Sequence, residues 1–411
     1  MKIKSYQLCS PDSLISTVMT LFFVWCTTIL HIASSNANPF LGENVQLRGS
    51  LNNSRLKFTQ QKQGHVAFMG GSITEMNGYR PMVCENLRKR FPETKFTFTD
   101  AGISSTCSTT GAFRLATDVL SQGPVDLFFV EFAVNDDQDA GHARRECIRG
   151  MEGILRHCRR HNPNMDIILT FFVNEGMLKK LQADDTPLTI MAHGDVAKHY
   201  QVSTINLAKQ VAEQIAADKL TWKQYGGVHP APVGNAICAK MIEELFDSVW
   251  SMPLDSTARI SPHPIPAEPL DPHHYGQGHF INPVEAISKN GWKLEVPDWK
   301  VLPGSKRPRF SSIPLFCATS VGSEATLEFI GTAVGAFLVA GPDAGKLEAS
   351  LDGGPNTLID TFHNYSRGLH YPRTVMFATD LTPGRHLLTL KVSDQTNSDN
   401  HAVRIIQFVA N

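Results

Sequence analysis

Three short stretches of the chain carry side chains suited to acyl transfer. Ser72 follows two glycines in "FMGGSIT", Asn135 opens "NDD", and His229 stands in "GGVHPAP". Ester cleavage needs a hydroxyl, a base within hydrogen-bond reach, and donors aimed at the developing oxyanion. Each residue also has a structural interpretation: a helix N-cap for Ser72, a turn former for Asn135, and a surface histidine for His229. The three stretches together favour the catalytic interpretation.

Other chemistry at "GGSITEMNG" is excluded by the spacing of its residues. No Gly-Lys-Ser/Thr ending follows, so this is no Walker phosphate loop. The absence of G-x-S-x-G argues against an α/β-hydrolase, and the absence of G-x-G-x-x-G argues against a dinucleotide site. The stretch "HHYGQGH" (273–279) lies in an irregular segment, and we expect neither a metal nor a cofactor.

The chain contains eight cysteines, two of them near the N-terminus. The other six form no C-x-x-C pair and have no paired spacing with histidine, which argues against zinc. We expect mostly buried thiols, and the sequence leaves one disulfide open. The six are Cys84, Cys107, Cys147, Cys158, Cys238 and Cys317.

Short runs rich in Val, Ile and Phe alternate with helical patterns between residues 65 and 250. The expected strands are 65–69, 95–100, 125–134, 165–172 and 202–207. The expected helices are 78–91, 109–122, 144–161, 190–201 and 234–250. This alternation predicts a parallel sheet covered by helices on both faces, with the site beyond the carboxyl ends of the strands. We expect Asp136, Asp137 and Asp139 to cap the helix that follows them.

The order and spacing of these blocks resemble the SGNH (GDSL-type) hydrolase superfamily. "FMGGSIT" stands at the nucleophile block, "VEFAVND" at the oxyanion asparagine block and "GGVHPAP" at the D-x-x-H-P block of the base. The resemblance covers about 60–250 and implies a three-layer α/β/α fold and ester hydrolysis. It implies Ser72 as nucleophile and His229 as base. Asn135 and the backbone N–H groups of Ser72 and Ser105 are then the oxyanion donors.

The chain departs from the family pattern at two positions. Ser105 stands where the family has a glycine that donates its N–H, with Gly102 as a weaker alternative and Gly71 as a further substrate contact. Gly226 stands where the triad acid would be. The resemblance then implies a Ser–His dyad, with His229 oriented by the backbone carbonyl of residue 225 or 226. Glu131 replaces the acid only if its side chain turns toward the site.

The remaining chain divides into segments of different composition. Residues 1–37 are expected to be a secretory signal, with an uncleaved membrane anchor as the alternative, followed by a connecting segment, 38–60. The catalytic domain is 61–252, a Pro/His-rich linker is 253–308, and a β-sandwich is 309–411. The β-sandwich resembles the jelly-roll modules of secreted carbohydrate-active enzymes. Its loop 360–373 offers His363, Tyr365 and Arg367 as sugar contacts above Ser72.

The net charge of −1, from 38 basic and 39 acidic residues, gives no field for nucleic acid. We therefore expect an exported serine esterase that removes a small acyl group, acetyl, from a carbohydrate, without a membrane partner after signal cleavage. Two alternatives stay open: a glycan-binding protein with a decayed esterase site, and an acyltransferase on the same scaffold.

Overall fold

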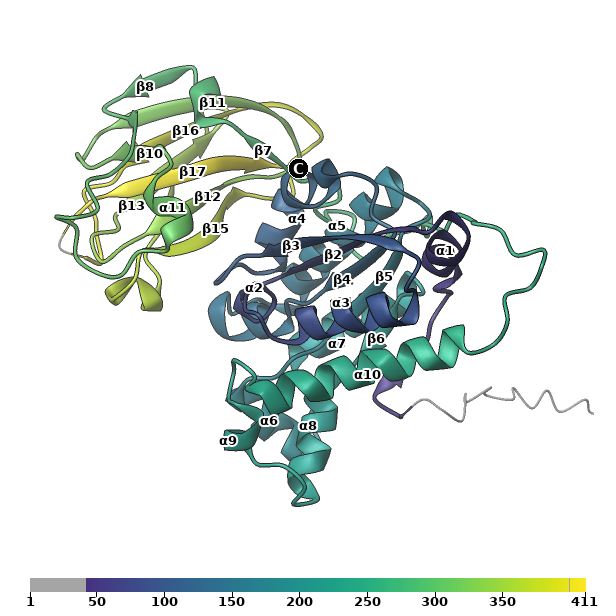
Figure 1. Ribbon diagram of the computed structural model, residues 1–411. Coiled ribbons are helices and arrows are strands. Elements are labelled where there is room, and N and C mark those ends of the chain that lie inside the picture. The colour runs from purple at the N-terminus through teal and green to yellow at the C-terminus, as the bar shows by residue number, and fades with distance from the viewer. Residues whose placement is uncertain (1–41, 399) are drawn as a thin grey trace, which may run out of the picture. The chain divides into compact units, whose positions relative to one another are not determined.

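A six-stranded sheet forms the centre of the first part of the chain in this computed structural model, which describes residues 42–398 and 400–411 (Figure 1). The strand order is β1-β6-β5-β4-β2-β3, and neighbours are parallel except at the edge strand β1. The strands are β1 (Val45–Gln46), β2 (Gln63–Gly70), β3 (Lys95–Gly102), β4 (Leu127–Val130), β5 (Asp166–Thr170) and β6 (Ser203–Ile205). All five predicted strands are present, and β1 is an addition.

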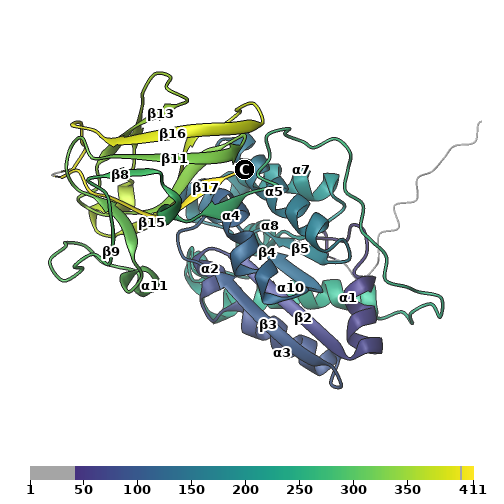
Figure 2. The same ribbon diagram turned by 90° about the horizontal axis from the view of Figure 1, so that it is seen from above.

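Helices cover both faces of this sheet, with α3 packed against α10 on one face and α4 against α5 on the other (Figures 1 and 2). The longer helices are α3 (Tyr79–Arg90), α4 (Ser108–Asp118), α5 (Arg144–His161), α6 (Glu175–Gln182), α7 (Leu188–His199), α8 (Leu207–Ala216) and α10 (Pro232–Trp250). The short ones are α1 (Asn52–Leu56), η1 (Lys57–Gln61), α2 (Ser72–Glu75), η2 (Leu120–Gln122), η3 (Asn135–Asp139) and α9 (Trp222–Tyr225). The five predicted helices match α3, α4, α5, α7 and α10.

The strand order places a crevice at the carboxyl ends of β2 and β4. β3, which follows β2 in the chain, pairs with one edge of β2. The next strand, β4, pairs with the opposite edge of β2. Ligands of open parallel sheets bind where the strand order reverses in this way. The segments that carry Ser72 and Asn135 follow these two strands, so the topology brings them to one rim.

The second part of the chain is a β-sandwich of two antiparallel sheets. One sheet has the order β15-β12-β17-β10-β9 with β7 beside β17, and the other has the order β14-β13-β16-β11-β8. The strands are β7 (His279–Ile281), β8 (Ser288–Asn290), β9 (Lys293–Glu295), β10 (Leu315–Ala318), β11 (Glu324–Gly331), β12 (Val334–Ala340), β13 (Lys346–Leu351), β14 (Thr357–Asp360), β15 (Tyr371–Ala378), β16 (Gly384–Val392) and β17 (Val403–Ala410). Short helical turns are η4 (Pro283–Glu285), α11 (Pro308–Ser311) and η5 (Asn364–Arg367). The predicted fold class, an α/β/α domain followed by an antiparallel β-sandwich, is confirmed.

The prediction of a linker over 253–308 is wrong for residues 279–295. The strands β7, β8 and β9 lie there and pair with β17, β11 and β10. Each has only three residues, too few for an alternation of apolar and polar residues to mark a strand in the sequence.

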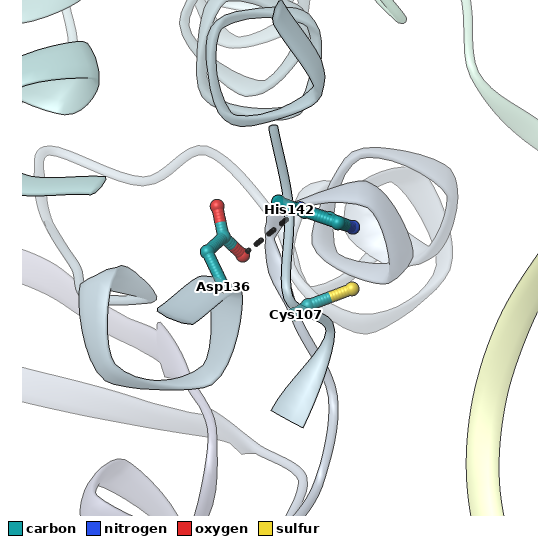
Figure 3. Close-up of side chains that lie close together, drawn as sticks. All are labelled: Cys107, Asp136 and His142. Carbon is teal, nitrogen blue, oxygen red and sulfur yellow. Dashed lines mark ion pairs between the residues drawn. The ribbon is translucent and has the colours of Figure 1, made fainter. Parts of the chain in front are cut away.

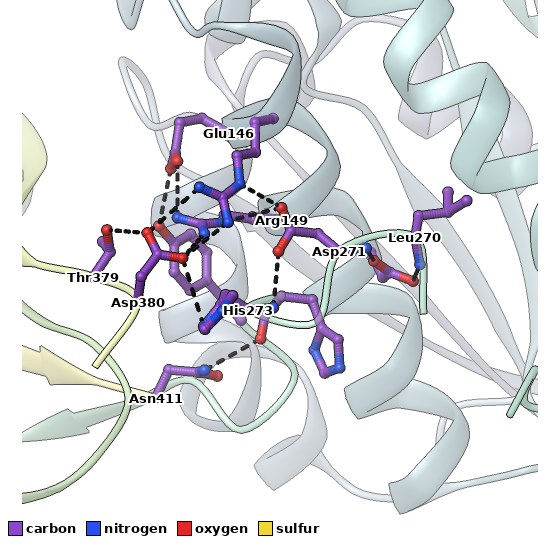
Figure 4. A network of polar contacts seen from close by, with 12 residues as sticks. Glu146, Arg149, Leu270, Asp271, His273, Thr379, Asp380 and Asn411 are labelled. Atoms are coloured by element: carbon purple, nitrogen blue, oxygen red, sulfur yellow. Dashed lines mark hydrogen bonds and ion pairs between the residues drawn. The ribbon is translucent and has the colours of Figure 1, made fainter. Parts of the chain in front are cut away.

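A network of charged side chains joins the two parts, which lie within one compact unit (Figure 4). Arg149, on α5, is 1% exposed and pairs with Asp380 of the sandwich and with Asp271. Arg145 pairs with the same two carboxylates, at 2.9 and 2.8 Å. Because buried charges are costly unless paired, this shared network holds the sandwich against α5.

The six cysteines among the described residues are all free and buried, and Cys147 and Cys158 share α5 as predicted. None of the helices formed by residues 42–398 and 400–411 is long and apolar enough to cross a membrane. The predicted signal segment, 1–37, lies outside the described residues.

Candidate active site

Ser72 and His229 meet at the carboxyl edge of the sheet. Ser72 is the first residue of α2, directly after β2, and His229 lies in the loop between α9 and α10. The distance from Ser72 Oγ to His229 Nε2 is 2.8 Å, so the imidazole can take the hydroxyl proton. The hydroxyl therefore faces a base, and the N-cap position of α2 belongs to Gly71.

The two glycines before Ser72 allow side chains to approach the turn closely. A Cβ at Gly70 would lie 2.1 Å from Glu131 Oε1, and one at Gly71 would lie 2.2 Å from Asn135 Oδ1. Glu131 accepts the N–H of Gly71 at 3.0 Å and the hydroxyl of Thr74 at 2.8 Å. Its burial raises the pKa of the carboxyl to about 8. Through these two hydrogen bonds Glu131 stabilises the turn that carries Ser72. It makes no hydrogen bond to His229.

The three expected oxyanion donors lie around Ser72. Ser105 has φ +73°, a backbone conformation that glycine adopts without strain, and its N–H bonds no described residue. This conformation explains why the family has glycine there. The Ser72 N–H lies in the first turn of α2, where helices leave donors free. Asn135 is buried beside Gly71 and donates from Nδ2 to Asp139, while its Oδ1 bonds none of the described residues.

No residue of the described chain orients the second nitrogen of His229. Nδ1 makes no hydrogen bond within residues 42–398 and 400–411, and no carboxylate affects the pKa of the ring. The carbonyl of Tyr225, one of the expected partners, accepts the N–H of Ala231 at 2.7 Å instead. Among the described residues, the expected carbonyl contact is therefore absent, and Ser72 and His229 form a hydrogen-bonded pair without a third member.

Residues 68–237 match the model of the GDSL-like lipase/acylhydrolase family. The match spans the segments of Ser72, Ser105, Asn135 and His229. The range 68–237 is therefore a GDSL-like lipase/acylhydrolase domain. As an acylhydrolase domain it is of the carboxylic ester hydrolase class.

The combination of this GDSL-like domain and the β-sandwich is similar to solved two-domain structures. One is a two-domain esterase (CEX) active on acetylated mannans, co-crystallised with mannopentaose: TM-score 0.72, 19% identity, covering 89% of this chain and 96% of that chain. Another structure, of a two-domain esterase (CEX) active on acetylated mannans, gives TM-score 0.72 and 20% identity, covering 89% and 97%. At these identities the likeness establishes the shared fold. No curated protein sequence matches the chain.

The β-sandwich contributes to the cavity above the GDSL-like domain. This cavity, of roughly 640 Å³, is lined by Ser72, Ser105 and His229 together with Arg307, Tyr365 and Tyr371. The Tyr371 hydroxyl donates to the carbonyl of Ser105 at 3.2 Å. The predicted approach of loop 360–373 to Ser72 thus has a structural counterpart in these two tyrosines.

Four other predicted contact residues do not line this cavity. The N–H of Gly71 is taken by Glu131, and the N–H of Gly102 bonds Asp100 at 3.0 Å, so neither glycine is available to a substrate. His363 bonds the Asp139 carbonyl at 2.7 Å and supports the loop from outside the cavity. Arg367 is exposed and does not line the cavity.

Sequence reasoning missed Arg307 and Asp139 as members of the site. Arg307 Nη2 donates to Ser105 Oγ at 2.8 Å, and Nε is buried without a partner among the described residues. Burial raises the pKa of Asp139 to about 6. Arg307 came from the expected linker and Asp139 from an expected helix cap, so neither position carried a signal for the site.

The turn at Gly226 prevents the family's acid from being restored by substitution. Gly226 has φ +108°, and a Cβ there would lie 2.0 Å from the backbone N of Ala231. We expect Gly226→Asp to lower the free energy of unfolding by about 2–4 kcal/mol, from backbone strain and overpacking, without raising kcat. Urea unfolding and acetate release check this.

Gly227 supplies the matched control for that substitution. It also has positive φ, +80°, but a Cβ there meets nothing within 4 Å. Gly227→Asp should therefore cost only the backbone strain, about 1–2 kcal/mol. A faster and equally stable Gly226→Asp enzyme would contradict the steric account.

Ester hydrolysis by this domain should persist into mildly acidic solution. Partial burial, and then the charge of Arg307, lower the pKa of His229 from its usual 6.5. The base acts as neutral imidazole, so a lower pKa keeps it active at lower pH. The midpoint of the acid limb of kcat/KM should lie below pH 6.5, and Arg307→Gln should move it upward. Asp139 lines the same cavity and has a pKa of about 6, so it can contribute to the same limb. The pH profiles of the wild type and of Arg307→Gln are therefore also measured in an Asp139→Asn background.

Proposed function

We propose that the protein is a secreted serine esterase that removes acetyl groups from a carbohydrate. The observation that carries the proposal is the 2.8 Å contact between Ser72 Oγ and His229 Nε2 in an open cavity of an acylhydrolase domain. Secretion rests on the apolar segment and small residues within 1–37.

The mechanism follows from the positions of these groups. Ser72 Oγ attacks the acetyl carbonyl while His229 Nε2 takes its proton, and the N–H groups of residues 72 and 105 with Asn135 stabilise the oxyanion. The tetrahedral intermediate collapses, and His229 returns the proton to the departing sugar oxygen. Water, deprotonated by His229, then attacks the acetyl-enzyme and releases acetate and free Ser72.

The carbohydrate part of the proposal rests on the β-sandwich. Two tyrosines from it line the cavity, and Tyr365 is 46% exposed, as suits a ring that stacks on a sugar face. The two-domain fold similar to this chain belongs to an esterase active on acetylated mannans, which makes acetylated mannan the first substrate to test.

A glycan-binding protein with a decayed esterase site is the second candidate. The unpartnered Nδ1 of His229 favours it, because an unoriented imidazole loses tautomer control and charge stabilisation. An acyltransferase on the same scaffold remains the third, since an acetyl-enzyme can also pass its acyl group to a sugar hydroxyl.

Acetate release separates the three candidates. The purified protein is incubated with acetylated mannan, acetylated xylan and p-nitrophenyl acetate, and free acetate and sugar acetylation are followed. Catalytic acetate release from a polysaccharide supports the esterase. Glycan binding without release supports the decayed site, and acetylation of added oligosaccharide that exceeds hydrolysis supports the transferase.

Tyr365→Ala should raise KM for the acetylated polysaccharide about 5–30-fold, because stacking of a ring contributes on the order of 1–2 kcal/mol. The kcat of this variant for p-nitrophenyl acetate should stay unchanged, because the Tyr365 side chain makes no hydrogen bond to Ser72 or His229. Tyr365→Phe retains the ring and is the control. Equal losses on both substrates would argue against a sugar-binding role.

A further inference from the structure

Cys107, Asp136 and His142 form a second cluster of reactive side chains (Figure 3). Two of them line a cavity that shares Ser105, Asp139 and Tyr371 with the active-site cavity. Cys107 is the N-cap residue of α4, Asp136 lies in η3, and His142 precedes α5. One ligand atom from each residue lies within 4.8 Å of the others. Their positions along the chain form no metal motif, and only the fold brings them together.

We propose that Cys107, Asp136 and His142 bind a divalent transition metal ion, with zinc as the first candidate. Thiolate, imidazole and carboxylate are the three ligand types of zinc in proteins. With metal–ligand lengths of about 2.0–2.3 Å in a tetrahedron, ligand atoms lie roughly 3.3–3.8 Å apart. The distance from His142 Nδ1 to Asp136 Oδ1 is 3.6 Å, which fits this spacing.

The candidate ligand atoms have unused bonding capacity. His142 Nδ1 is buried, and its contact with Asp136 Oδ1, at 3.6 Å, is longer than a hydrogen bond. The hydrogen bond of Cys107 Sγ is a long one, 3.7 Å, to Thr110. Asp136 Oδ1 accepts the N–H of Ser108 at 2.8 Å and keeps a lone pair free. Since a buried polar atom that is held only by a long contact is poorly compensated for its lost hydration, a bound metal would improve the bonding of His142 Nδ1.

The surroundings orient the carboxylate and give access. Asp136 Oδ2 accepts the Ser108 hydroxyl at 2.6 Å and bonds His193 Nε2 at 2.9 Å, the kind of outer contacts that fix metal ligands. Cys107 and His142 also line a cavity of roughly 410 Å³, which offers an entry path and room for a water as fourth ligand. This cavity is also lined by Arg373, whose charge faces the same space.

A metal at this site would link the two chain segments that carry the expected oxyanion donors Ser105 and Asn135. Cys107 follows Ser105 by two positions, and Asp136 directly follows Asn135. A metal held by both segments would fix their separation without contacting the substrate. The proposed binding itself does not depend on the esterase activity.

Cobalt spectroscopy tests the proposal on the full chain after chelator treatment and dialysis. Co²⁺ should bind at one equivalent, with the visible bands of a tetrahedral site and the near-ultraviolet charge-transfer band of a thiolate, and Zn²⁺ should displace it. Cys107→Ser should abolish the charge-transfer band, and His142→Gln should weaken binding more than about 100-fold. Cys317→Ser, which removes a buried thiol of the sandwich, is the control.

Three results would overturn the proposal. The first is the absence of a thiolate band in the wild type, which would leave a thiol–imidazole pair, and the second is a band that persists in Cys107→Ser. Loss of the band in Cys147→Ser alone would also overturn it, because Cys147, His193 and Asp136 form the neighbouring trio. If Cys107→Ser fails to fold, zinc-dependent elevation of the Tm in wild type but not in His142→Gln decides instead.

Discussion

Ser72→Ala should lower the rate of acetate release by about 10²–10⁴. In complete triads, loss of the nucleophile or base costs about 10⁶ and neutralising the acid about 10⁴. In the proposed mechanism no carboxylate of the described residues bonds His229, so we expect the wild-type enzyme to be slower than a complete triad and to lose less when Ser72 is removed. Initial rates with p-nitrophenyl acetate and an acetylated polysaccharide measure the effect.

Three further variants make this result interpretable. His229→Ala should cost as much as Ser72→Ala, and the double variant should cost no more than either, because the two groups act as one unit. Ser203→Ala removes a hydroxyl that bonds the Arg48 backbone far from the cavity, and it should leave the rate unchanged. Equal acetate release by wild type and Ser72→Ala would place the activity outside this pair.

The sequence predicted the site as far as strand topology dictates it. Ser72 and Asn135 follow adjacent parallel strands, and the carboxyl ends of such strands must meet at one rim. His229 was placed there through the family's block order. The contact between Ser72 and His229 needed no information beyond these patterns.

The sequence could not predict groups that reach the site from other elements. Arg307 approaches Ser105 because the sandwich docks on α5, and that docking depends on pairs such as Arg149 with Asp380 that no local pattern encodes. The sequence likewise did not predict that Nδ1 of His229 bonds none of the described residues.

The expectation that the aspartates within 136–139 cap the following helix is also wrong, because all three accept hydrogen bonds from residues outside that helix. Asp136 binds the N–H of Ser108, at the start of α4, and Asp137 accepts from Asn174. Asp139 accepts from Asn135 and lines the active-site cavity. Local spacing predicts caps for the next helix, whereas the π-helical turn of η3 directs these carboxylates toward other segments.

Asn135→Ala should lower kcat by about 10²–10³, the usual cost of one oxyanion donor. Asn135 Nδ2 has two hydrogens, and the bond to Asp139 uses one of them. That bond leaves the second hydrogen without a partner among the described residues, and the proposed mechanism assigns this hydrogen to the oxyanion. Because a transition-state interaction is removed, kcat and kcat/KM should fall together with KM nearly unchanged.

Two comparisons distinguish donation from packing. Asn135→Asp keeps the shape but replaces the donor by an acceptor beside Asp139, so it should be at least as slow as Asn135→Ala. Asn86→Ala, which removes an amide bonded to Glu243 on the outer helices, should retain the wild-type rate. If Asn135→Asp instead kept near wild-type kcat, the amide would be a packing group, and the backbone N–H groups of Ser72 and Ser105 alone would stabilise the oxyanion.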